Sequence, residues 1–402
     1  MNEVTLVATS KSIAHKTIQF FCCYDSQKHL VYLEANDLTH PSLVSQIHVV
    51  RLENHVPHVG CFFVMESGQK LFLPEKETKK AICVRRMSGN KTFCQGDLFL
   101  LQVKKDALKT KDAVATATLE ITDAYLSLGY PGHGFGISKK ASEKDKERLN
   151  LALAEEELTG AFHVLVRTKG SGEETSLLKE RLNQRVDLLK EIIRRAESAL
   201  HPTCLYQGKN RGQQFLDAFP IKEKEQEVTK ILTDDPQLYE ELKNMTYAKV
   251  LAPLYEDSSF SLGDLYRLQT SLKELTAKTV WMKSGANLVI EPTEALTVVD
   301  VNTAKASSKK DLFSVNMEAA EKAMEQLRLR NISGIILIDF INLKNKQEQQ
   351  EVLKLLCREA EKDPVKVSVL GYTATGLVEI TREKIHPSLN QVLTGKIYCG
   401  NI

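Results

Sequence analysis

Two aspartates and an asparagine are the side chains of this sequence best placed to do chemistry together. Asp300 and Asn302 follow the apolar run 295–299, and Asp339 follows a second apolar run, 334–338. Two carboxylates brought together repel each other unless a cation lies between them or one takes up a proton. A hard divalent ion held by one or two carboxylates, with water and substrate phosphate completing its shell, is the usual Mg²⁺ arrangement. Such an ion polarises phosphoryl oxygens and acidifies bound water, as phosphodiester hydrolysis requires.

The segment between the two aspartates must bring them to one place. The runs 295–299 and 334–338 predict strands. A helix is predicted between them by an apolar stripe with spacings of three and four: Phe313, Met317, Ala320, Met324 and Leu327. A strand, a helix and a strand imply parallel pairing with a right-handed crossover. Because sites in open α/β sheets lie at the carboxyl ends of strands, we expect the aspartates to meet there.

The same pattern sets two further expectations. Both strands are near-continuous in apolar residues, which predicts burial on two faces. Asn302 lies two residues past Asp300, on the same side of an extended chain, so its amide could orient the phosphate or the water. The alternative, that both aspartates merely cap the following turns, stays open at this point.

A basic segment precedes these elements. Residues 76–111 hold ten Lys or Arg against three acids, and phenylalanines lie within this segment or shortly before it: Phe63, Phe72, Phe93 and Phe99. Short strands at regular spacing between 42 and 120 predict a small antiparallel barrel of the OB type. Cations that neutralise phosphates and rings that stack on bases suit a single-stranded nucleic-acid platform. A solvated basic loop beside ordinary core phenylalanines is the alternative.

Arg167 and Thr168 form a second candidate anion site. They end the predicted strand 163–166 and open a Gly-rich turn, and a long helix from about 178 to 200 follows. A guanidinium beside a hydroxyl, in a turn with backbone N–H groups, can hold a terminal phosphate. An ordinary exposed polar turn would have the same composition.

Composition limits the class of protein. At 402 residues, with 42% hydrophobic and 26% charged residues, the chain should form two to four folded domains. No run of about 18 apolar residues exists, so no membrane span is expected, and the first residues do not read as a secretory signal. Eight cysteines without a C-x-x-C pair favour reduced thiols and a cytoplasmic protein. A net charge of +2 means that any polyanion-binding surface depends on local segregation of charge.

Taken together, these motifs resemble the ribonuclease E/G family of bacterial endoribonucleases. The matching stretches are residues 280–285, 291–302, 326–330, 334–341 and 376–382, which read VWMKSG, EPTEALTVVDVN, QLRLR, GIILIDFI and GLVEITR. The resemblance implies an α/β multidomain fold, in which a ribonuclease-H-like domain carries inserted domains and is followed by a DNase-I-like α/β catalytic domain. The implied divisions are 1–37 (first ribonuclease-H-like segment), 38–120 (S1-type OB fold binding RNA), 121–212 (5′-phosphate sensor), 213–278 (second ribonuclease-H-like segment) and 279–402 (catalytic domain).

The resemblance also implies roles for single residues. Asp300 and Asp339 look like Mg²⁺ ligands, with Mn²⁺ as an alternative, and Asn302 looks like the residue that orients the scissile group. Arg167 and Thr168 look like the pocket for a 5′-monophosphate. The residues expected to contact RNA are Phe63, Phe72, Lys105, Lys111 and Lys366. The implied reaction is cleavage of single-stranded, A/U-rich RNA to a 5′-phosphate and a 3′-hydroxyl, in rRNA processing and mRNA decay.

Several positions depart from the family pattern. The C-P-x-C zinc link is absent and only Cys399 stands near the end, so no zinc-clamped dimer is expected, although a homodimer without zinc is still considered. The connection after Asp300, with Lys309-Lys310-Asp311, is short, and Asn342 and Ala374 replace residues common in the family. These changes motivate a rival hypothesis, a non-catalytic RNA-binding protein on the same scaffold. A metal phosphohydrolase acting on small nucleotides is a third.

Overall fold

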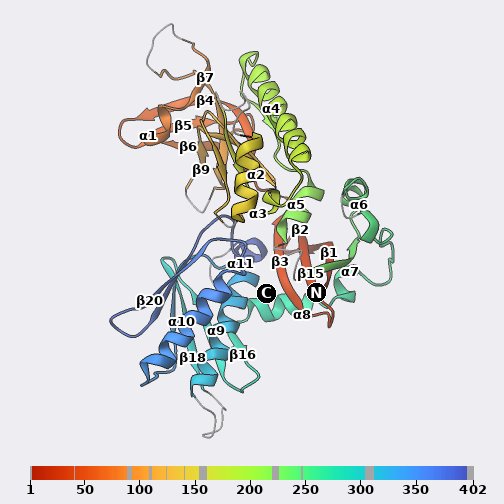
Figure 1. Ribbon diagram of the computed structural model, residues 1–402, viewed down its shortest axis with the longest axis vertical. Helices are drawn as coiled ribbons and strands as arrows, with labels where there is room; N and C mark the ends of the chain where they lie inside the picture. The colour runs from red at the N-terminus through yellow and green to blue at the C-terminus, as the bar shows by residue number, and fades with distance from the viewer. Residues whose placement is uncertain are drawn as a thin grey trace. The chain divides into compact units, whose positions relative to one another are not determined.

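The computed structural model divides the chain into two compact units, residues 1–41 with 211–402, and residues 42–210 (Figure 1). It describes residues 2–39, 41–87, 93–107, 111–123, 125–139, 141–153, 161–219, 226–245, 248–303 and 312–395. The Lys309-Lys310-Asp311 connection and Cys399 lie outside these ranges. Among the described residues, no helix is long and apolar enough to cross a membrane.

The first unit contains a four-stranded sheet in the order β15-β1-β2-β3. Its strands are β1 (Asn2–Ile13), β2 (Lys16–Asp25), β3 (Leu30–Asp37) and β15 (Gln226–Thr233). β1 pairs in parallel with β15 and antiparallel with β2, which also pairs antiparallel with β3. The accompanying helices are α5 (Arg211–Ala218), α6 (Pro236–Lys243), a 3₁₀ turn (Ala248–Val250), α7 (Leu262–Leu265) and α8 (Leu268–Thr276). Apolar clusters form on both faces of this sheet. The assignment of this region as ribonuclease-H-like stays a prediction.

The same unit contains a six-stranded sheet in the order β16-β17-β18-β19-β21-β20. Its strands are β16 (Thr279–Trp281), β17 (Asn287–Pro292), β18 (Leu296–Asn302), β19 (Gly334–Asp339), β20 (Val367–Tyr372) and β21 (Val378–Arg382). The helices α9 (Leu312–Leu329) and α10 (Lys346–Ala360) pack on it, whereas the buried side chains of α11 (Leu389–Thr394) join an apolar cluster of the four-stranded sheet. β18 and β19, which precede and follow α9 in the sequence, pair in parallel with each other. This confirms the predicted order of strand, helix and strand with parallel pairing.

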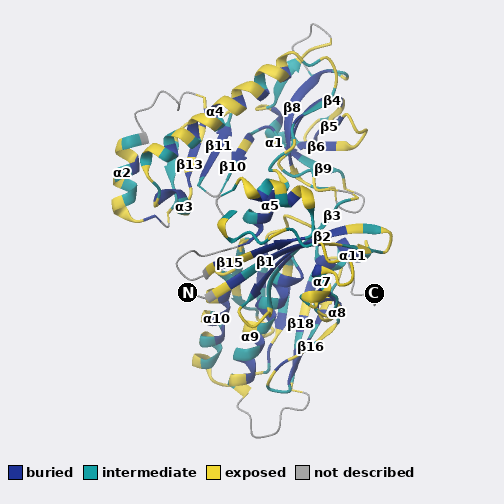
Figure 2. Ribbon diagram, turned by 90° about the vertical axis from the view of Figure 1, so that its right-hand side faces the viewer, coloured by how far each residue is buried: buried dark blue, intermediate teal, exposed yellow. Residues whose placement is uncertain are grey.

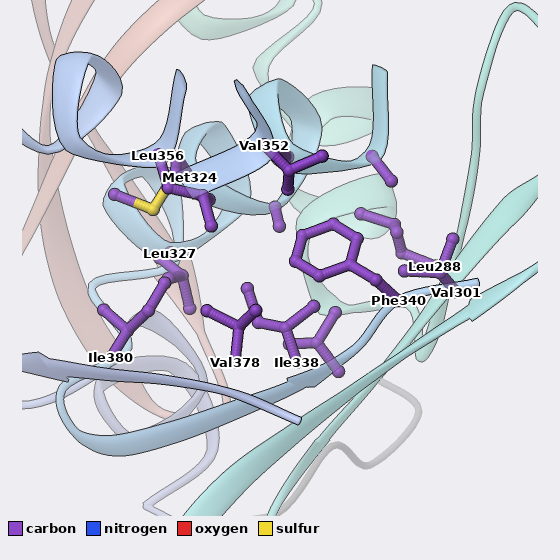
Figure 3. Close-up of a cluster of buried hydrophobic side chains, with 14 of the residues drawn as sticks. Leu288, Val301, Met324, Leu327, Ile338, Phe340, Val352, Leu356, Val378 and Ile380 are labelled. Atoms are coloured by element: carbon purple, nitrogen blue, oxygen red, sulfur yellow. The ribbon is translucent and has the colours of Figure 1, made fainter. Parts of the chain in front are cut away.

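Among the described residues, helices cover only one face of this second sheet. Side chains of α9 and α10, such as Met324, Val352 and Leu356, pack against Ile338 and Val378 (Figure 3). The opposite face carries exposed apolar side chains on several strands: Trp281, Val298, Ile335 and Leu370. The expectation that β18 and β19 are buried on both faces is therefore wrong. Both helices pack on the same side, so alternate residues of each strand point away from the core.

The second unit contains a five-stranded barrel. Its strands are β4 (Ile47–Val56), β5 (Gly60–Val64), β6 (Lys70–Pro74), β8 (Leu98–Lys105) and β9 (Ala113–Thr116). They pair in the order β4-β5-β6-β9-β8, and β8 returns to β4 to close the ring. This closed antiparallel arrangement, with one parallel contact between β6 and β9, is OB-like, as predicted. The short helix α1 (Glu75–Thr78) and the strands β7 (Ile82–Arg85) and β14 (Thr203–Tyr206) border the barrel.

A four-stranded sheet beside one long helix completes the second unit. The strands are β10 (Leu119–Thr122), β11 (Leu126–Tyr130), β12 (Phe135–Ile137) and β13 (His163–Val166), and the helices are α2 (Glu143–Leu153), α3 (Thr168–Ser171) and α4 (Thr175–Glu197). Two successive strands of the chain belong to different sheets here, since β10 pairs in this sheet and β9 in the barrel. α4 buries one face and exposes the other (Figure 2). It begins at Thr175 and ends at Glu197, close to the predicted helix from about 178 to 200, and Leu200 beyond its end is 71% exposed.

Candidate active site

Asp300 and Asp339 stand opposite each other on neighbouring strands. They are direct partners in the parallel ladder of β18 and β19, and neighbouring strands lie about 4.8 Å apart. Side chains of paired residues point to the same face of a sheet, here the face that the helices leave uncovered. Asp339 is exposed and Asp300 half-buried. The fold thus brings together two carboxylates that are 39 residues apart in the sequence, at the ends of two strands, as predicted.

Asn302 is joined to this pair. Its Nδ2 donates a hydrogen bond of 2.8 Å to Oδ2 of Asp300. This bond uses one of the two N–H donors of the amide, and within the described ranges the other donor and the amide oxygen remain for a further ligand. Asn302 therefore holds the Asp300 carboxylate in orientation in addition to the role predicted for it toward the substrate.

Sequence reasoning missed Asn316, a buried polar residue that positions the end of β19. Its Nδ2 donates to the carbonyl of Ile341 at 2.7 Å, and its Oδ1 accepts from the backbone N–H of the same residue at 3.0 Å. This two-way contact ties the segment directly after Asp339 to α9. The signal available in the sequence was an asparagine between two apolar residues, Val315 and Met317, of the predicted helix.

The donor atoms at this edge fit a hard cation. Within the ranges that the structure describes, no three or more His, Cys, Asp or Glu side chains gather to hold a metal. The site therefore rests on two carboxylates with an amide beside them. Mg²⁺ is commonly bound by one or two carboxylates and keeps several waters, whereas structural zinc takes four protein ligands rich in sulfur and nitrogen.

Arg167 and Thr168 lie side by side at the start of α3, and both are exposed. Nη1 of Arg167 donates to the carbonyl of Asp123 at 2.7 Å, and the Thr168 hydroxyl contacts the Ser138 hydroxyl at 2.8 Å. The segment predicted as an open Gly-rich turn is a short helix. Gly170 is required in it, because a Cβ there would lie 2.3 Å from the carbonyl oxygen of Tyr125.

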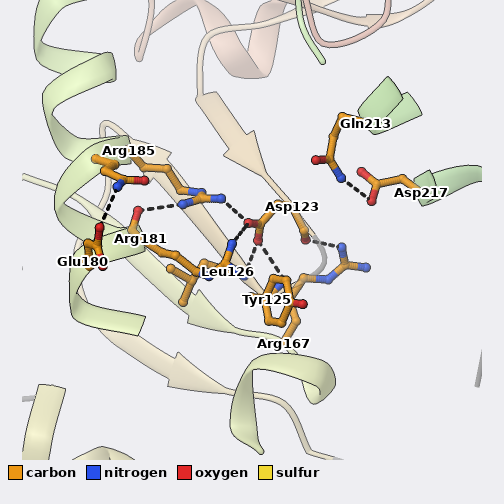
Figure 4. A network of polar contacts seen from close by, with 10 residues as sticks. Asp123, Tyr125, Leu126, Arg167, Glu180, Arg181, Arg185, Gln213 and Asp217 are labelled. Atoms are coloured by element: carbon orange, nitrogen blue, oxygen red, sulfur yellow. Dashed lines mark hydrogen bonds and ion pairs between the residues drawn. The ribbon is translucent and has the colours of Figure 1, made fainter. Parts of the chain in front are cut away.

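A charged network supports this corner (Figure 4). The Asp123 carboxylate accepts from the backbone N–H groups of Tyr125 and Leu126 and forms an ion pair with Arg185. The guanidinium of Arg181 lies over the Tyr125 ring, 4.2 Å from its centroid. On the same ring, Nζ of Lys169 lies 5.0 Å from the centroid. These contacts fix the turn whose carbonyl holds Arg167, and they gather positive charge around it.

The barrel corrects one predicted RNA contact. Phe63 is 1% exposed and packs on Phe99 in the barrel core, with ring centroids 5.4 Å apart, so it has no face to offer RNA. Its neighbour Phe62 points outward, pairs with Phe72 across β5 and β6, and lies 5.1 Å from it. Phe62 and Phe72 are both half-buried. The aromatic pair on the outside of the barrel is therefore Phe62 with Phe72.

The lysines predicted to contact RNA lie in different places. Lys105, at the end of β8, and Lys111 are exposed in the second unit. Lys366 is exposed and lies directly before β20. The first residue of β20, Val367, pairs with Arg382, and Arg382 pairs with Gly334, the first residue of β19. Lys366 thus lies at the opposite end of the sheet from Asp339, roughly 17 Å away along the strands. The structure does not bring Lys366 to the aspartates.

Comparison with known proteins decides the family. A family model described as "Ribonuclease E/G family" matches residues 123–385, more than half of the chain. This chain belongs to the ribonuclease E/G family. Ribonuclease G of Escherichia coli (strain K12) is 32% identical over 79% of this chain and 65% of that protein. Ribonuclease E of the same strain is 27% identical over 91% of this chain and 36% of that protein. The chain therefore spans 65% of the length of that ribonuclease G.

A plant relative extends the comparison. The chloroplastic ribonuclease E/G-like protein of Arabidopsis thaliana is 28% identical over 76% of this chain and 32% of that protein. The residues matched by the ribonuclease E/G model include Asp300, Asp339, Arg167 and Thr168. The barrel strands lie before the matched range.

Two arginines from the ribonuclease E/G motifs have structural roles. Arg330 is 4% exposed and donates to the carbonyls of Ala277 and Glu274, where α8 ends. Cations at a helix C-terminus stabilise its unpaired carbonyls. Arg382 is 3% exposed and forms two hydrogen bonds to Asp363, of 2.9 and 3.1 Å. Both side chains join elements of the first unit and are too buried to contact RNA.

Proposed function

We propose that this chain is an endoribonuclease that hydrolyses single-stranded RNA with a divalent cation, Mg²⁺ or Mn²⁺, held by Asp300 and Asp339. The observation that carries the proposal is the direct pairing of these two aspartates on an open sheet face, in a chain of the ribonuclease E/G family. The products are a 5′-phosphate and a 3′-hydroxyl, and the substrates are A/U-rich RNAs in rRNA processing and mRNA decay.

Asp300, Asp339 and Asn302 have different roles in the proposed hydrolysis. Asp300 and Asp339 would hold the cation, which would supply polarisation of a phosphoryl oxygen and a more acidic water. Asp300 and Asp339 supply oxygen ligands and, as neighbouring like charges, attract the cation. Asn302 fixes the orientation of Asp300 through their 2.8 Å hydrogen bond and presents its remaining polar atoms to the phosphate. Fixed donors of this kind need little reorganisation when charge develops in the transition state.

The second unit holds the RNA in this proposal. The outward ring pair Phe62 and Phe72 and the exposed Lys105 and Lys111 provide stacking and phosphate contacts. Arg167 and Thr168 recognise the 5′-monophosphate, and the domain division inferred from the resemblance assigns them to the sensor domain. A homodimer is compatible with the proposal.

Phe72→Ala should weaken binding of a single-stranded A/U-rich RNA. Stacking on one aromatic ring contributes about 1–3 kcal/mol per base, so the dissociation constant should rise roughly 5- to 150-fold. Fluorescence anisotropy of a labelled oligomer measures this change. Phe63→Leu is the matched control, since its ring is in the core. It should lower stability and leave affinity nearly unchanged. A greater loss of affinity with Phe63→Leu than with Phe72→Ala would reverse the assignment.

Arg167→Ala should abolish discrimination between 5′-monophosphorylated and 5′-hydroxyl RNA. A charge-assisted hydrogen bond contributes about 1.5–3 kcal/mol, so the wild-type protein should prefer the phosphorylated substrate by roughly tenfold or more. The measurement compares kcat/KM for the two substrates in each protein. Arg194→Ala, an exposed arginine on α4 paired with Glu191, should keep the preference. An unchanged ratio in Arg167→Ala would exclude this residue from 5′-end recognition.

The rival hypothesis of a non-catalytic RNA-binding protein makes a different prediction. Ala374 lies in the turn between β20 and β21, and Asn342 lies three residues after Asp339, both near the aspartate end of the sheet. Neither change removes a carboxylate of the pair. End-labelled A/U-rich RNA incubated with and without Mg²⁺ tests the proposal, because the enzyme shortens the RNA only with Mg²⁺. Retarded but intact RNA in both samples would support the rival.

A further inference from the structure

Trp281 is the sole tryptophan of the chain, and it is unusually exposed to solvent. Its side chain is 60% exposed, although a large ring of this kind is mostly buried in folded proteins. It ends β16, the edge strand of the six-stranded sheet. Its neighbours in sequence, Val280 and Met282, pack toward the apolar cluster under α9. Because strand residues alternate, Trp281 points to the uncovered face.

The strand register places this indole in line with the candidate active site. Trp281 pairs with Asn287 of β17, and Asn287 pairs with Asn302 of β18. The three residues therefore form one row across the sheet, on the face that carries Asp300 and Asp339. Two strand spacings separate Trp281 from Asn302, about 10 Å. Neighbouring nucleotides of an extended RNA strand can span this separation.

The hairpin that carries Trp281 is held in place. The N–H of Met282 donates to the carbonyl of Ala286 at 2.9 Å, and Gly285 closes the turn at a φ of 86°. Both carboxylate oxygens of Glu318, on α9, lie 3.2 Å from the N–H of Ser284. The indole thus projects from a turn anchored to the helix behind the sheet. Little backbone freedom is therefore lost when a ligand stacks on it.

We infer that Trp281 is a positioning residue on which a base of the single-stranded substrate, near the scissile phosphate, stacks. The inference rests on the proposed function. An exposed π-face accepts any base, so stacking there adds affinity with little sequence preference. Lys283, exposed beyond β16, supplies positive charge for the strand. We favour RNA over a protein partner on this face, because the row that begins with Trp281 ends at the polar Asn302, which is hydrogen-bonded to Asp300 of the candidate site.

Tryptophan fluorescence tests this inference without cleavage. All tryptophan emission of the protein comes from residue 281, and stacking on a base should quench it. Metal-free protein in EDTA is titrated with a single-stranded A/U-rich oligomer, while anisotropy of a labelled copy reports binding. Quenching that saturates together with anisotropy supports the inference. Binding without quenching overturns it and leaves the proposed function intact. Quenching without cleavage after Mg²⁺ is added would keep the inference and contradict the proposed hydrolysis.

Variants separate stacking from a general apolar effect. Trp281→Ala should raise KM for single-stranded RNA about 5- to 150-fold and change kcat much less, and Trp281→Phe should restore most of the loss. Leu370→Ala is the matched control, since Leu370 is also 60% exposed and apolar but lies on β20, the opposite edge strand. Equal effects of Trp281→Ala and Leu370→Ala would overturn the inference. Concentration-dependent self-association lost in both variants would assign this face to a second copy of the chain instead.

Discussion

Asp300→Asn and Asp339→Asn should each lower the rate of Mg²⁺-dependent RNA cleavage by about three orders of magnitude or more. Each change replaces an anionic ligand with a neutral amide, and a catalytic cation supplies several kcal/mol of charge stabilisation in the transition state. In the proposed reaction the two carboxylates act on one cation, so the double variant should be about as slow as either single variant. Single-turnover cleavage of a labelled oligomer measures all three rates.

The control for these variants is Glu291→Gln. Glu291 is an exposed carboxylate on the neighbouring strand β17 and forms an ion pair with Lys278. In the strand ladder it lies opposite Val298 of β18. Removing an exposed charge there should change the rate less than about twofold, because exposed ion pairs contribute little. Circular dichroism should show the same fold in all variants. Wild-type cleavage rates in Asp300→Asn or Asp339→Asn would refute the site.

Asp363→Ala should lower the free energy of unfolding far more than the removal of an exposed charge. It would leave the buried guanidinium of Arg382 without its carboxylate, although that guanidinium also donates to Oδ1 of Asn331 at 2.7 Å. The Arg382 and Asp363 side chains are 2% and 1% exposed. Removing one partner of a buried ion pair costs about 3–5 kcal/mol. Urea denaturation should show a fall of this size in the free energy of unfolding.

An exposed ion pair provides the comparison for this loss. Arg358 and Glu321 are 3.9 Å apart, and their side chains are 66% and 59% exposed. Glu321→Ala should therefore change the free energy of unfolding by less than about 1 kcal/mol. If Asp363→Ala and Glu321→Ala lowered the free energy of unfolding by equally small amounts, the buried ion pair of Arg382 with Asp363 would not stabilise the fold. The structural role given to this motif arginine would then fail.

The elements around the aspartates could be predicted because their patterns are local. The two apolar runs and the stripe from Phe313 to Leu327 correspond to β18, β19 and α9. The uncovered sheet face could not be predicted, since it depends on α9 and α10 packing on one side, which strand composition does not encode. Runs such as Leu296–Val299 read the same whether one face or two are buried.

Contacts set by register were harder to predict. A shift of one residue along a strand exchanges the inward and outward faces, so the sequence could not choose between Phe62 and Phe63. The same holds for Lys366, whose distance from Asp339 depends on antiparallel pairing through β21. Motif arginines give no local signal either. Arg330 and Arg382 are buried in tertiary contacts, whereas Arg167 is exposed, and the sequence alone does not distinguish them.

Binding of Mn²⁺ to RNA-free protein tests the central claim most directly, because Mn²⁺ accepts the same oxygen ligands as Mg²⁺ and is visible by electron paramagnetic resonance. The titration compares wild type with Asp300→Asn, Asp339→Asn and Glu291→Gln. We expect wild type and Glu291→Gln to bind Mn²⁺ with the same affinity. In Asp300→Asn and Asp339→Asn the affinity should fall about tenfold or more, since each variant loses one of the two proposed anionic ligands. Equal Mn²⁺ affinity in all four proteins would show that Asp300 and Asp339 do not share a cation.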